Sequence, residues 1–334
     1  MEHVCRLIHS REALQAGYTG RGITAAVIDT GIGPHPDIPY DRVRMFRDFI
    51  NLKRMPYDDS GHGTHVCGIL AGNGRLAGGR WCGVAPECTL VVLKALDHRG
   101  DGEPSCVMAA IKWLLERREE LGVRVLNLSF GAGYEELDDD YYRLLDMIKK
   151  VWESGICVVG AAGNLGPAPG TITVPGCSRN MVTVGASERG KFANQYSGRG
   201  PTREGVKKPD LVAPAGGITS LAPLPHDIRG RLVRFFPGRQ FSTGGLWTQA
   251  EWNQVMSNRA VKSRLFRSGY LKKSGTSMST PMVTGAICLL LQKEPGLNPE
   301  EIRRRLWQSS VDLGLPEEQQ GHGIIDIRLL LGLE

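Results

Sequence analysis

The sequence contains no long apolar run. Its apolar stretch at 287–291 ends at Gln292-Lys293-Glu294, far short of the roughly 20 residues that a membrane-spanning helix needs. The first ten residues likewise lack the apolar core and the small-residue cleavage site of a signal peptide. We therefore expect neither a membrane segment nor a secretory leader.

Cysteine pairs in the CxxC pattern are also absent, which excludes a zinc ribbon. The eight cysteines are scattered and lie mostly in apolar segments, where free thiols act as small hydrophobic side chains. Without a leader, they predict a reducing compartment and so a cytoplasmic protein. The composition, 41% apolar and 23% charged, is ordinary for a globular chain, and 334 residues allow one large α/β domain or two smaller ones.

The most informative segment that is present is Gly275–Pro281, which directly precedes an apolar run. This context predicts a buried helix with Ser277 in its first turn. Unpaired backbone N–H groups and the helix dipole favour negative charge at such a place. Hydrolases need this property because an oxyanion develops beside their nucleophile.

Two upstream segments supply partners for this serine. The apolar, β-branched run Ala25–Gly31 predicts a buried strand that delivers Asp29 at its carboxyl end. The segment Asp59–Gly68 places His62 at the start of another helix of small and apolar residues. A Ser hydroxyl needs an imidazole to take its proton, and a buried carboxylate holds that imidazole in the right tautomer. The three side chains therefore predict acyl transfer.

Other chemistries fit these residues less well. Asp29 lies in an Asp-Thr-Gly sequence, as in aspartic proteases, but the second such sequence that their chemistry requires is absent. His62 and His65 are three residues apart and could face zinc from one helix, yet no third ligand is evident. We therefore expect His65 to have a structural role. Asn164, which follows a strand and a glycine turn, could be a plain turn residue or an amide donor to an oxyanion.

Strand and helix patterns alternate along the chain, which predicts a parallel sheet with helices on both faces. The candidate strands are Ile23–Ile28, Thr89–Leu93, Val123–Leu128, Ile156–Gly160, Met181–Gly185 and Leu211–Ala213. The candidate helices are Ser105–Leu121, Asp138–Ser154, Thr276–Lys293 and Pro299–Ser309. Asn298 suits the cap of the last helix, and Pro299 suits its first turn.

Four blocks together resemble the subtilisin-like serine proteases, or subtilases. They are Val27–Gly31, Gly61–His65, Ala161–Asn164 and Gly275–Met278, in the order and at spacings compatible with that family. Weaker similarity covers about 22–329, and the prodomain-poor, intracellular bacterial subtilases resemble the chain most. The resemblance implies an α/β, three-layer fold with a mostly parallel central sheet and helices on both faces. It also implies a short N-terminal extension, 1–22, too short for a folded prodomain, and a catalytic domain over 23–334.

The same resemblance implies a serine endopeptidase. Ser277 would attack the scissile carbonyl, His62 would serve as base and then acid, and Asp29 would orient His62. Asn164 and the backbone N–H of Ser277 would form the oxyanion hole. Polypeptide substrates would bind in extended form, and no organic cofactor is implied.

The resemblance further implies where substrate side chains bind. Ser129, Phe130, Gly131 and Leu165 would border the primary pocket. A second edge and a more distal pocket would be formed by Leu96, Gly100, Gly102, Pro104 and Val107. These residues include no fixed counter-charge, so we expect an apolar preference. Val107 could equally be part of a helix core.

One segment departs from the family pattern. A compact subtilase crosses this gap with a short loop, whereas this chain uses 58 residues, 217–274. They include ten Lys and Arg against two Asp and Glu, a net charge of +8 in a chain of net charge +6, and seven aromatic side chains after residue 234. The length favours a lid, an acidic-substrate exosite or an oligomer contact over a passive connection. A basic, aromatic surface could bind nucleic acid, but we favour an ordered loop with its own small cluster.

Structural calcium is common in subtilases, and Asp37 matches one of its acidic ligand positions. The loop that usually supplies further ligands is replaced by 74–81, whose two arginines and Trp81 argue against that site. Asp58 and Asp59 could serve another calcium ion, although a solvated turn before His62 is the simpler interpretation. The sequence thus leaves the metal content open.

Two further functions stay open at this point. One is a non-catalytic protein of the same fold that acts as a regulatory partner. The other is a peptide ligase or macrocyclase, because an amine can replace water as the acceptor of an acyl group. The masses of the products would separate ligation from hydrolysis.

Overall fold

The computed structural model describes residues 1–134, 139–187, 196–224 and 269–333, together with Asn253, Ser257 and Phe266. Its centre is a nine-stranded sheet with the order β10-β11-β7-β6-β5-β4-β1-β3-β2. Neighbouring strands are parallel except for the antiparallel pair β10 and β11 at one edge. The strands are β1 (Thr24–Asp29), β2 (Val43–Asp48), β3 (Thr89–Lys94), β4 (Val123–Leu128), β5 (Cys157–Ala161), β6 (Val182–Ser187), β7 (Leu211–Pro214), β10 (Ser310–Val311) and β11 (Ile324–Ile325).

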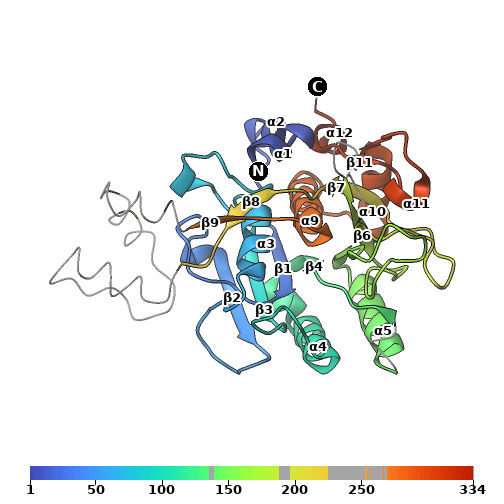
Figure 1. Cartoon of the computed structure of the whole chain (residues 1–334). Helices are drawn as coiled ribbons and strands as arrows, with labels where there is room; N and C mark the ends of the chain where they lie inside the picture. Colours follow the sequence, from blue (N-terminus) through green and yellow to red (C-terminus); the bar gives the residue numbers. More distant parts are fainter. Residues whose placement is uncertain are drawn as a thin grey trace.

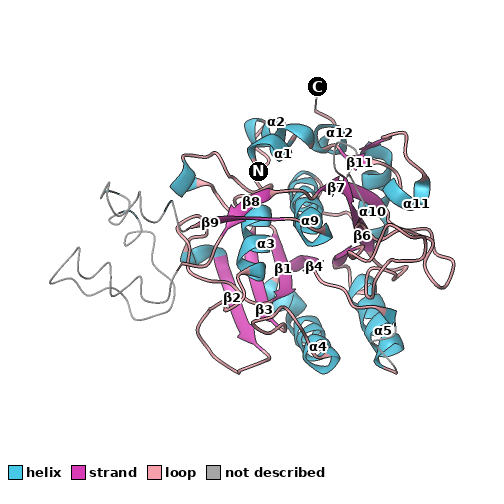
Figure 2. Ribbon diagram, viewed as in Figure 1, coloured by secondary structure: helices cyan, strands magenta, loops and turns pink. Residues whose placement is uncertain are grey.

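Helices cover the sheet on both faces (Figures 1 and 2). On one face α3 (His62–Ala71) packs against α9 (Thr276–Lys293), and on the other α4 (Pro104–Leu121) packs against α5 (Asp140–Glu153). The remaining helices are α1 (Glu2–Leu7), α2 (Ser10–Gln15), α10 (Pro299–Ser309), α11 (Glu317–Gln320) and α12 (Ile327–Leu331). Strand β1 is buried along its whole length, because the side chains on both of its faces meet a helix layer. The three-layer α/β fold expected from the sequence is thus confirmed.

The predicted elements are all present, with boundaries that match or differ by one or two residues. The capping prediction for α10 also holds: Asn298 accepts from the backbone of Glu301 at 3.0 Å, and Glu301 accepts from that of Asn298 at 2.8 Å. Strand β2 was not predicted. It lies at the edge of the sheet, and burial does not alternate regularly along its sequence, Val-Arg-Met-Phe-Arg-Asp.

The first residues of the chain belong to the same core as the sheet. Met1, Val4 and Ile8 are buried in the main apolar cluster, and α2 packs against α12 from the far end of the chain. The division into an extension over 1–22 and a catalytic domain stays a prediction. The packing nevertheless makes 1–22 an integral part of the described fold.

Two strands near the two ends of the basic segment, 217–274, form a separate antiparallel ribbon. Its strands are β8 (Ile218–Leu221) and β9 (Tyr270–Lys273), with Ile218 opposite Lys273 and Leu221 opposite Tyr270. The ribbon lies across α3, as the yellow and orange strands in Figure 1 show. Most of 225–268 lies outside the described residues, so the lid, exosite and oligomer expectations for this segment stay predictions.

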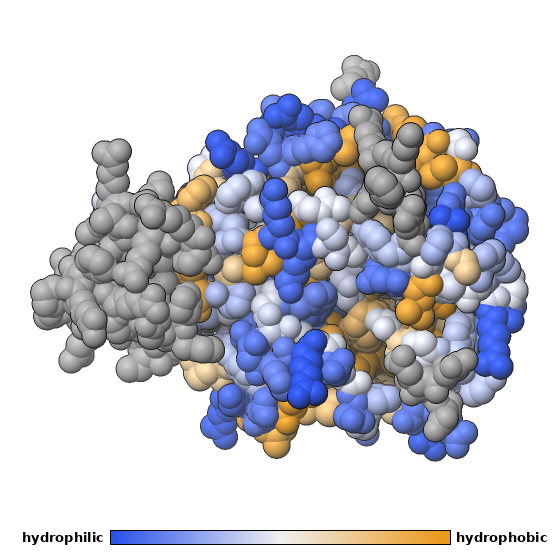
Figure 3. All heavy atoms as spheres, viewed as in Figure 1, coloured by the Kyte–Doolittle hydropathy of each residue, from blue (hydrophilic) through white to orange (hydrophobic). Residues whose placement is uncertain are grey.

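The surface seen in Figure 3 is mixed, with apolar patches interspersed among charged and polar side chains. Within the described part of the chain, no helix has both the length and the apolar character required to cross a membrane.

Candidate active site

Asp29 and His62 meet because the carboxyl end of β1 lies next to the first residue of α3. Asp29 is the last residue of β1 and is fully buried, and His62 is the first residue of α3. The Nδ1 atom of His62 lies 2.7 Å from Oδ1 of Asp29, which also accepts from the backbone N–H of Thr30 at 2.7 Å. Because the carboxylate faces Nδ1, the proton of a neutral imidazole sits on that nitrogen and Nε2 is left as a base.

The carboxylate also changes the acidity of the imidazole. Burial lowers the pKa of His62, but the charge of Asp29 and the hydrogen bond to it outweigh this effect and leave the pKa raised above 6.5. A raised pKa suits a group that must take up a proton and release it again.

A second carboxylate fixes the start of α3. Asp58 accepts from Thr30 Oγ1 at 2.9 Å and from the backbone N–H groups of Gly61 at 2.7 Å and Thr64 at 2.8 Å. It is only 3% exposed, so the interpretation of Asp58 as part of a solvated turn was wrong. The only sequence signal for this role is the position of Asp58 in a turn just before a helix.

Gly63 is required by the close approach of α3 to the end of β1. A Cβ atom at this position would lie 2.2 Å from the carbonyl oxygen of Gly31. The backbone N–H of Gly63 donates to Thr30 Oγ1 at 2.8 Å. Together with Asp58, these contacts hold His62 against Asp29.

Ser277 lies in the first turn of α9, as predicted. The preceding Gly275 has φ 132° and ψ 161°, a backbone conformation that residues with a side chain rarely adopt. Ser277 is partly exposed, and α9 packs beside α3. Among the described residues, no hydrogen bond joins Ser277 to His62. Such bonds are often long without a substrate and shorten when one binds.

Asn164 lies next to the same turn. Its Oδ1 accepts from the backbone N–H of Thr276 at 3.1 Å and from the Thr276 hydroxyl at 3.2 Å. A backbone N–H can only donate, so this contact identifies the amide atom facing Thr276 as the oxygen. The amide nitrogen is then directed away from Thr276. Sequence reasoning missed this role of Thr276, and the Thr-Ser pair alone carries no signal for it.

A hollow of about 320 Å³ gathers most of the predicted substrate-binding residues. It is lined by Leu96, Gly100, Asp101, Gly102, Pro104, Val107, Phe130, Gly131, Ala132, Leu144 and Val174. Val107 is 4% exposed, so it belongs both to the core of α4 and to this hollow. The two predicted pockets therefore share one wall, and Asp101, Ala132, Leu144 and Val174 were not anticipated.

Two predicted substrate-binding residues do not line this hollow. Ser129 is 1% exposed and accepts from Asn127 Nδ2 at 2.9 Å, whereas Leu165 is 58% exposed. Their assignment to the primary pocket stays a prediction.

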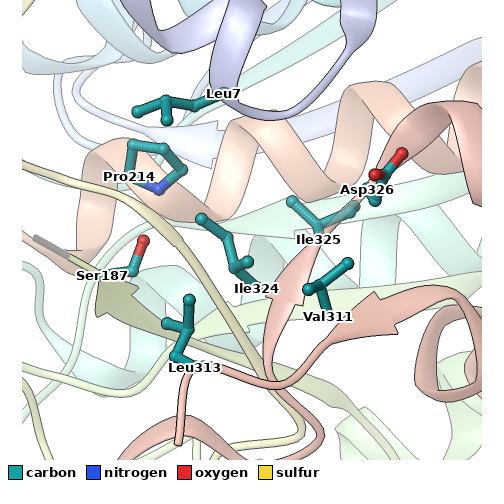
Figure 4. A pocket seen from close by; sticks show the side chains of 8 residues that line it. All are labelled: Leu7, Ser187, Pro214, Val311, Leu313, Ile324, Ile325 and Asp326. Carbon is teal, nitrogen blue, oxygen red and sulfur yellow. The ribbon is translucent and has the colours of Figure 1, made fainter.

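A second hollow, of about 250 Å³, lies at the β11 edge of the sheet (Figure 4). Its lining is mostly apolar, and Leu7 of α1 faces Ile324 and Pro214 across it. The carboxylate of Asp326 accepts from the backbone of Leu329 at 3.0 Å and lies 2.9 Å from Nδ1 of His9. Asp326 is engaged in these contacts, and the lining of this second hollow includes none of Asp29, His62 and Ser277.

The β8–β9 ribbon is held to the body by two buried histidines. His65 Nε2 lies 3.0 Å from the carbonyl oxygen of Ile218, and His35 Nε2 lies 2.8 Å from that of Gly269. Burial lowers the pKa of His65 to about 3 and lowers that of His35 as well. Both rings are therefore neutral donors, which agrees with the structural role predicted for His65.

Asp37, which matches a calcium-ligand position of the family, uses both carboxylate oxygens in hydrogen bonds. Its Oδ1 accepts from the backbone of Leu76 at 2.7 Å, and its Oδ2 accepts from the Tyr270 hydroxyl at 2.5 Å. Trp81 packs edge-on against Tyr270 and stacks on Phe266, with centroids 4.3 and 5.4 Å apart. Within the described ranges, no group of three or more His, Cys, Asp or Glu side chains could hold a metal ion. Asp59 instead pairs with the buried Lys94 at 2.8 Å.

The eight cysteines are all free thiols, and most are buried. Cys67, which follows His62 by five residues, is fully buried, and burial raises its pKa well above the usual value. Such a thiol is a poor target for thiol reagents.

Comparison with known proteins identifies similar sequences and a similar structure. The model of the Subtilase family of peptidases matches residues 20–323. Serine protease AprX of Bacillus subtilis (strain 168) is 34% identical over 313 residues, which cover 89% of this chain and 64% of the Bacillus protein. Subtilisin Savinase of Lederbergia lenta is 29% identical over 307 residues, which cover 92% of this chain and 90% of that protein.

The fold has solved counterparts as well. A crystal structure of a cold adapted subtilisin-like serine proteinase superposes with a TM-score of 0.66 at 24% identity, covering 92% of this chain and 89% of the other. The chain spans about two fifths to two thirds of the length of the first curated relatives. The family match over nearly the whole chain shows that this protein belongs to the Subtilase family.

Proposed function

We propose that this protein is a serine endopeptidase that hydrolyses peptide bonds through an acyl-enzyme. The observation that carries the proposal is the 2.7 Å contact between fully buried Asp29 and His62, at the start of a helix packed against the one that begins with Thr276-Ser277. Membership of the Subtilase family supports the same reaction.

In the proposed reaction, Ser277 Oγ attacks the scissile carbonyl carbon and its proton passes to His62 Nε2. Asp29 stabilises the resulting imidazolium through Nδ1–H. The oxyanion accepts from the Asn164 amide and the Ser277 backbone N–H at the positive end of α9. When the intermediate collapses, the C–N bond breaks and His62 gives its proton to the leaving amine. Water then releases the acyl group by the same steps, and no organic cofactor takes part.

Substrate would enter as an extended polypeptide along the hollow beside Phe130 and Gly131. The apolar side chains of Leu96, Val107 and Leu144 in its lining support a preference for apolar residues before the scissile bond. A reducing, cytoplasmic location is part of the proposal and is supported by the eight free thiols.

The decisive experiment treats the protein and its Ser277→Ala variant with a fluorophosphonate probe and with an unfolded protein substrate. We expect a single probe adduct and substrate cleavage with the wild type alone, both read by intact mass. The variant should retain the same circular dichroism spectrum. No adduct and no cleavage with a folded wild type would instead support a non-catalytic member of the family, and products joined by new peptide bonds would support a ligase.

A further inference from the structure

Lys273 ends β9 and precedes Ser277 by four residues. Side chains alternate along a strand, so Lys273 and its neighbour Lys272 lie on opposite faces of the ribbon. Lys273 is half-buried, whereas Lys272 is exposed. Across 1–134, 139–187, 196–224 and 269–333, no carboxylate forms an ion pair with Lys273. Lys273 is thus a half-buried lysine without an ion-pair partner in these ranges, and it lies close to the serine in the chain.

The ribbon fixes this lysine next to the helix that carries the imidazole. His65 lies one turn after His62 in α3. Its Nε2 is 3.0 Å from the carbonyl oxygen of Ile218, the register partner of Lys273, and 3.3 Å from that of Leu271. Lys273 therefore sits on a strand pair anchored one helical turn away from His62.

Several titratable or charged groups surround His62. Asp29 lies at the end of β1, Asp58 in the loop before α3, His65 in α3 itself and Lys273 in β9. Asp29 and Asp58 raise the pKa of His62, whereas Lys273 lowers the pKa of both His62 and His65. The geometry agrees with this direction, because Lys273 pairs in register with Ile218 of β8, and β8 packs against α3, the helix that begins at His62.

The direction of the reaction decides which part of a substrate meets this cation. His62 must give its proton to the leaving nitrogen, so the leaving segment lies on the His62 side of Ser277. The acyl segment lies instead toward Asn164 and the hollow beside Phe130 and Gly131. A charge that acts on His62 from the ribbon therefore belongs to the leaving-group side.

We propose that Lys273 is a specificity-determining residue that favours substrates with Asp or Glu directly after the scissile bond. The inference rests on the proposed endopeptidase function and names its substrate class, polypeptides that are cut before acidic residues. The net charge of +8 in 217–274 agrees with this preference, because Lys273 lies at the end of this basic segment. An ammonium and a carboxylate a few ångströms apart near a protein surface attract strongly enough to change kcat/KM about 3- to 30-fold.

The test uses matched peptides with one apolar sequence before the scissile bond and Glu, Gln or Lys in the position directly after it. We expect the wild type to cleave the Glu peptide about 3- to 30-fold more efficiently than the Lys peptide at low ionic strength. Lys273→Gln should abolish this ratio, Lys273→Glu should reverse it, and added salt should shrink it in the wild type. Lys272→Gln, which removes an exposed charge from the neighbouring position, should leave the ratio unchanged.

The acid limb of the kcat/KM profile supplies a second readout that a structural role would not move. Removing the cation in Lys273→Gln should shift this limb to higher pH, because the imidazole loses a neighbour that lowers its pKa. Equal rates on the Glu and Lys peptides in the wild type, or the same ratio in Lys273→Gln, would overturn the assignment.

A small anilide substrate separates this inference from the proposed function. Its leaving group carries no side chain, so the wild type and Lys273→Gln should both release it. Release of the anilide without any preference among the peptides would overturn the role of Lys273 alone. Failure of a folded wild type to cleave either substrate would overturn the endopeptidase and this inference with it.

Discussion

The backbone N–H and the hydroxyl of Thr276 both donate to Oδ1 of Asn164, at 3.1 and 3.2 Å. The residue just before the serine thereby orients an otherwise exposed amide. This relationship couples the start of α9 to the turn that follows β5. It leaves the amide hydrogens of Asn164 available for a developing oxyanion.

Replacing Asn164 by Ala should lower kcat by about 10²–10³ with little change in KM, the loss typical of removing an oxyanion donor from a subtilisin. Thr276→Val, which removes one of the two bonds that orient the amide, should cause a smaller loss in kcat. Thr276→Ser keeps the hydroxyl and should restore most of the rate. Steady-state kinetics on one peptide measures all three variants. A rise in KM at constant kcat would contradict the assignment.

Asp29→Asn should lower kcat by about 10⁴, because an amide cannot stabilise the imidazolium and favours the wrong tautomer of His62. The exchange preserves side-chain volume, so the far-ultraviolet spectrum and the labelling of any exposed cysteine should stay the same. Burst and steady-state kinetics of the purified variant would check the loss. A fall of less than tenfold would mean that Asp29 does not support His62 in this way.

The activity should fall as the pH drops through the pKa of His62, because protonated imidazole cannot accept the proton of Ser277. That pKa is raised above 6.5, so the midpoint of the acid limb of kcat/KM should lie above 6.5. Rate measurements from pH 5 to 9 on a substrate without titratable groups locate the midpoint. A midpoint below 6.5 would show that burial outweighs the carboxylate.

Acid should also destabilise the fold through His65. Its pKa is about 3 in the folded protein and about 6.5 in an unfolded chain, so the unfolded state binds the proton first as the pH falls. The loss of unfolding free energy caused by His65 is absent above pH 6.5. This loss grows as the pH drops toward 3, by up to about 1.4 kcal/mol per pH unit. His35 acts in the same direction, since burial lowers its pKa too.

His62 works in the opposite sense. Its raised pKa adds stability below the unfolded value, and this contribution is lost as the pH rises through the folded pKa. Urea unfolding of the Ser277→Ala variant at pH 7.5 and 5.5, with and without the added His65→Gln exchange, isolates the His65 term. A pH dependence that survives unchanged in the double variant would assign the effect to other groups.

Tyr270→Phe should lower the free energy of unfolding by about 1–3 kcal/mol, because it leaves a buried carboxylate oxygen of Asp37 without its donor. The matched control is Tyr40→Phe, since Tyr40 is 52% exposed. Equilibrium unfolding in the Ser277→Ala background would compare the two. Equal stability of both variants would show that water replaces the hydroxyl freely.

Much of the architecture followed from local patterns. The apolar, β-branched run at 25–28 predicted a buried strand, and the cap residue Asn298 predicted the start of α10, because both signals act within one element. Strand β2 and the β8–β9 ribbon were missed. Their stability comes from neighbours distant in the chain, such as β3 for β2 and α3 for the ribbon.

In the candidate site, too, some residues could be predicted from local sequence patterns and others could not. Asp29, His62, Asn164 and Ser277 could be named from motifs, because each stands at the end or start of an element with a recognisable pattern. The roles of Asp58 and Thr276 could not be named, since each depends on a hydrogen bond to a residue from another part of the site. The hydrogen bond from Tyr270 to Asp37 shows the same limit, because the two residues lie 233 positions apart in the chain.

The sequence by itself determined six strands of the central sheet, the main helices, the reactive residue types and the basic character of 217–274, because composition and periodicity are properties of neighbouring residues. Only the tertiary structure decided which of those residues meet. It places Asp29 against His62, Thr276 against Asn164 and the end of β9 beside α3. The physical reason is that hydrogen bonds and charges act over a few ångströms of space, and folding brings distant segments within that range.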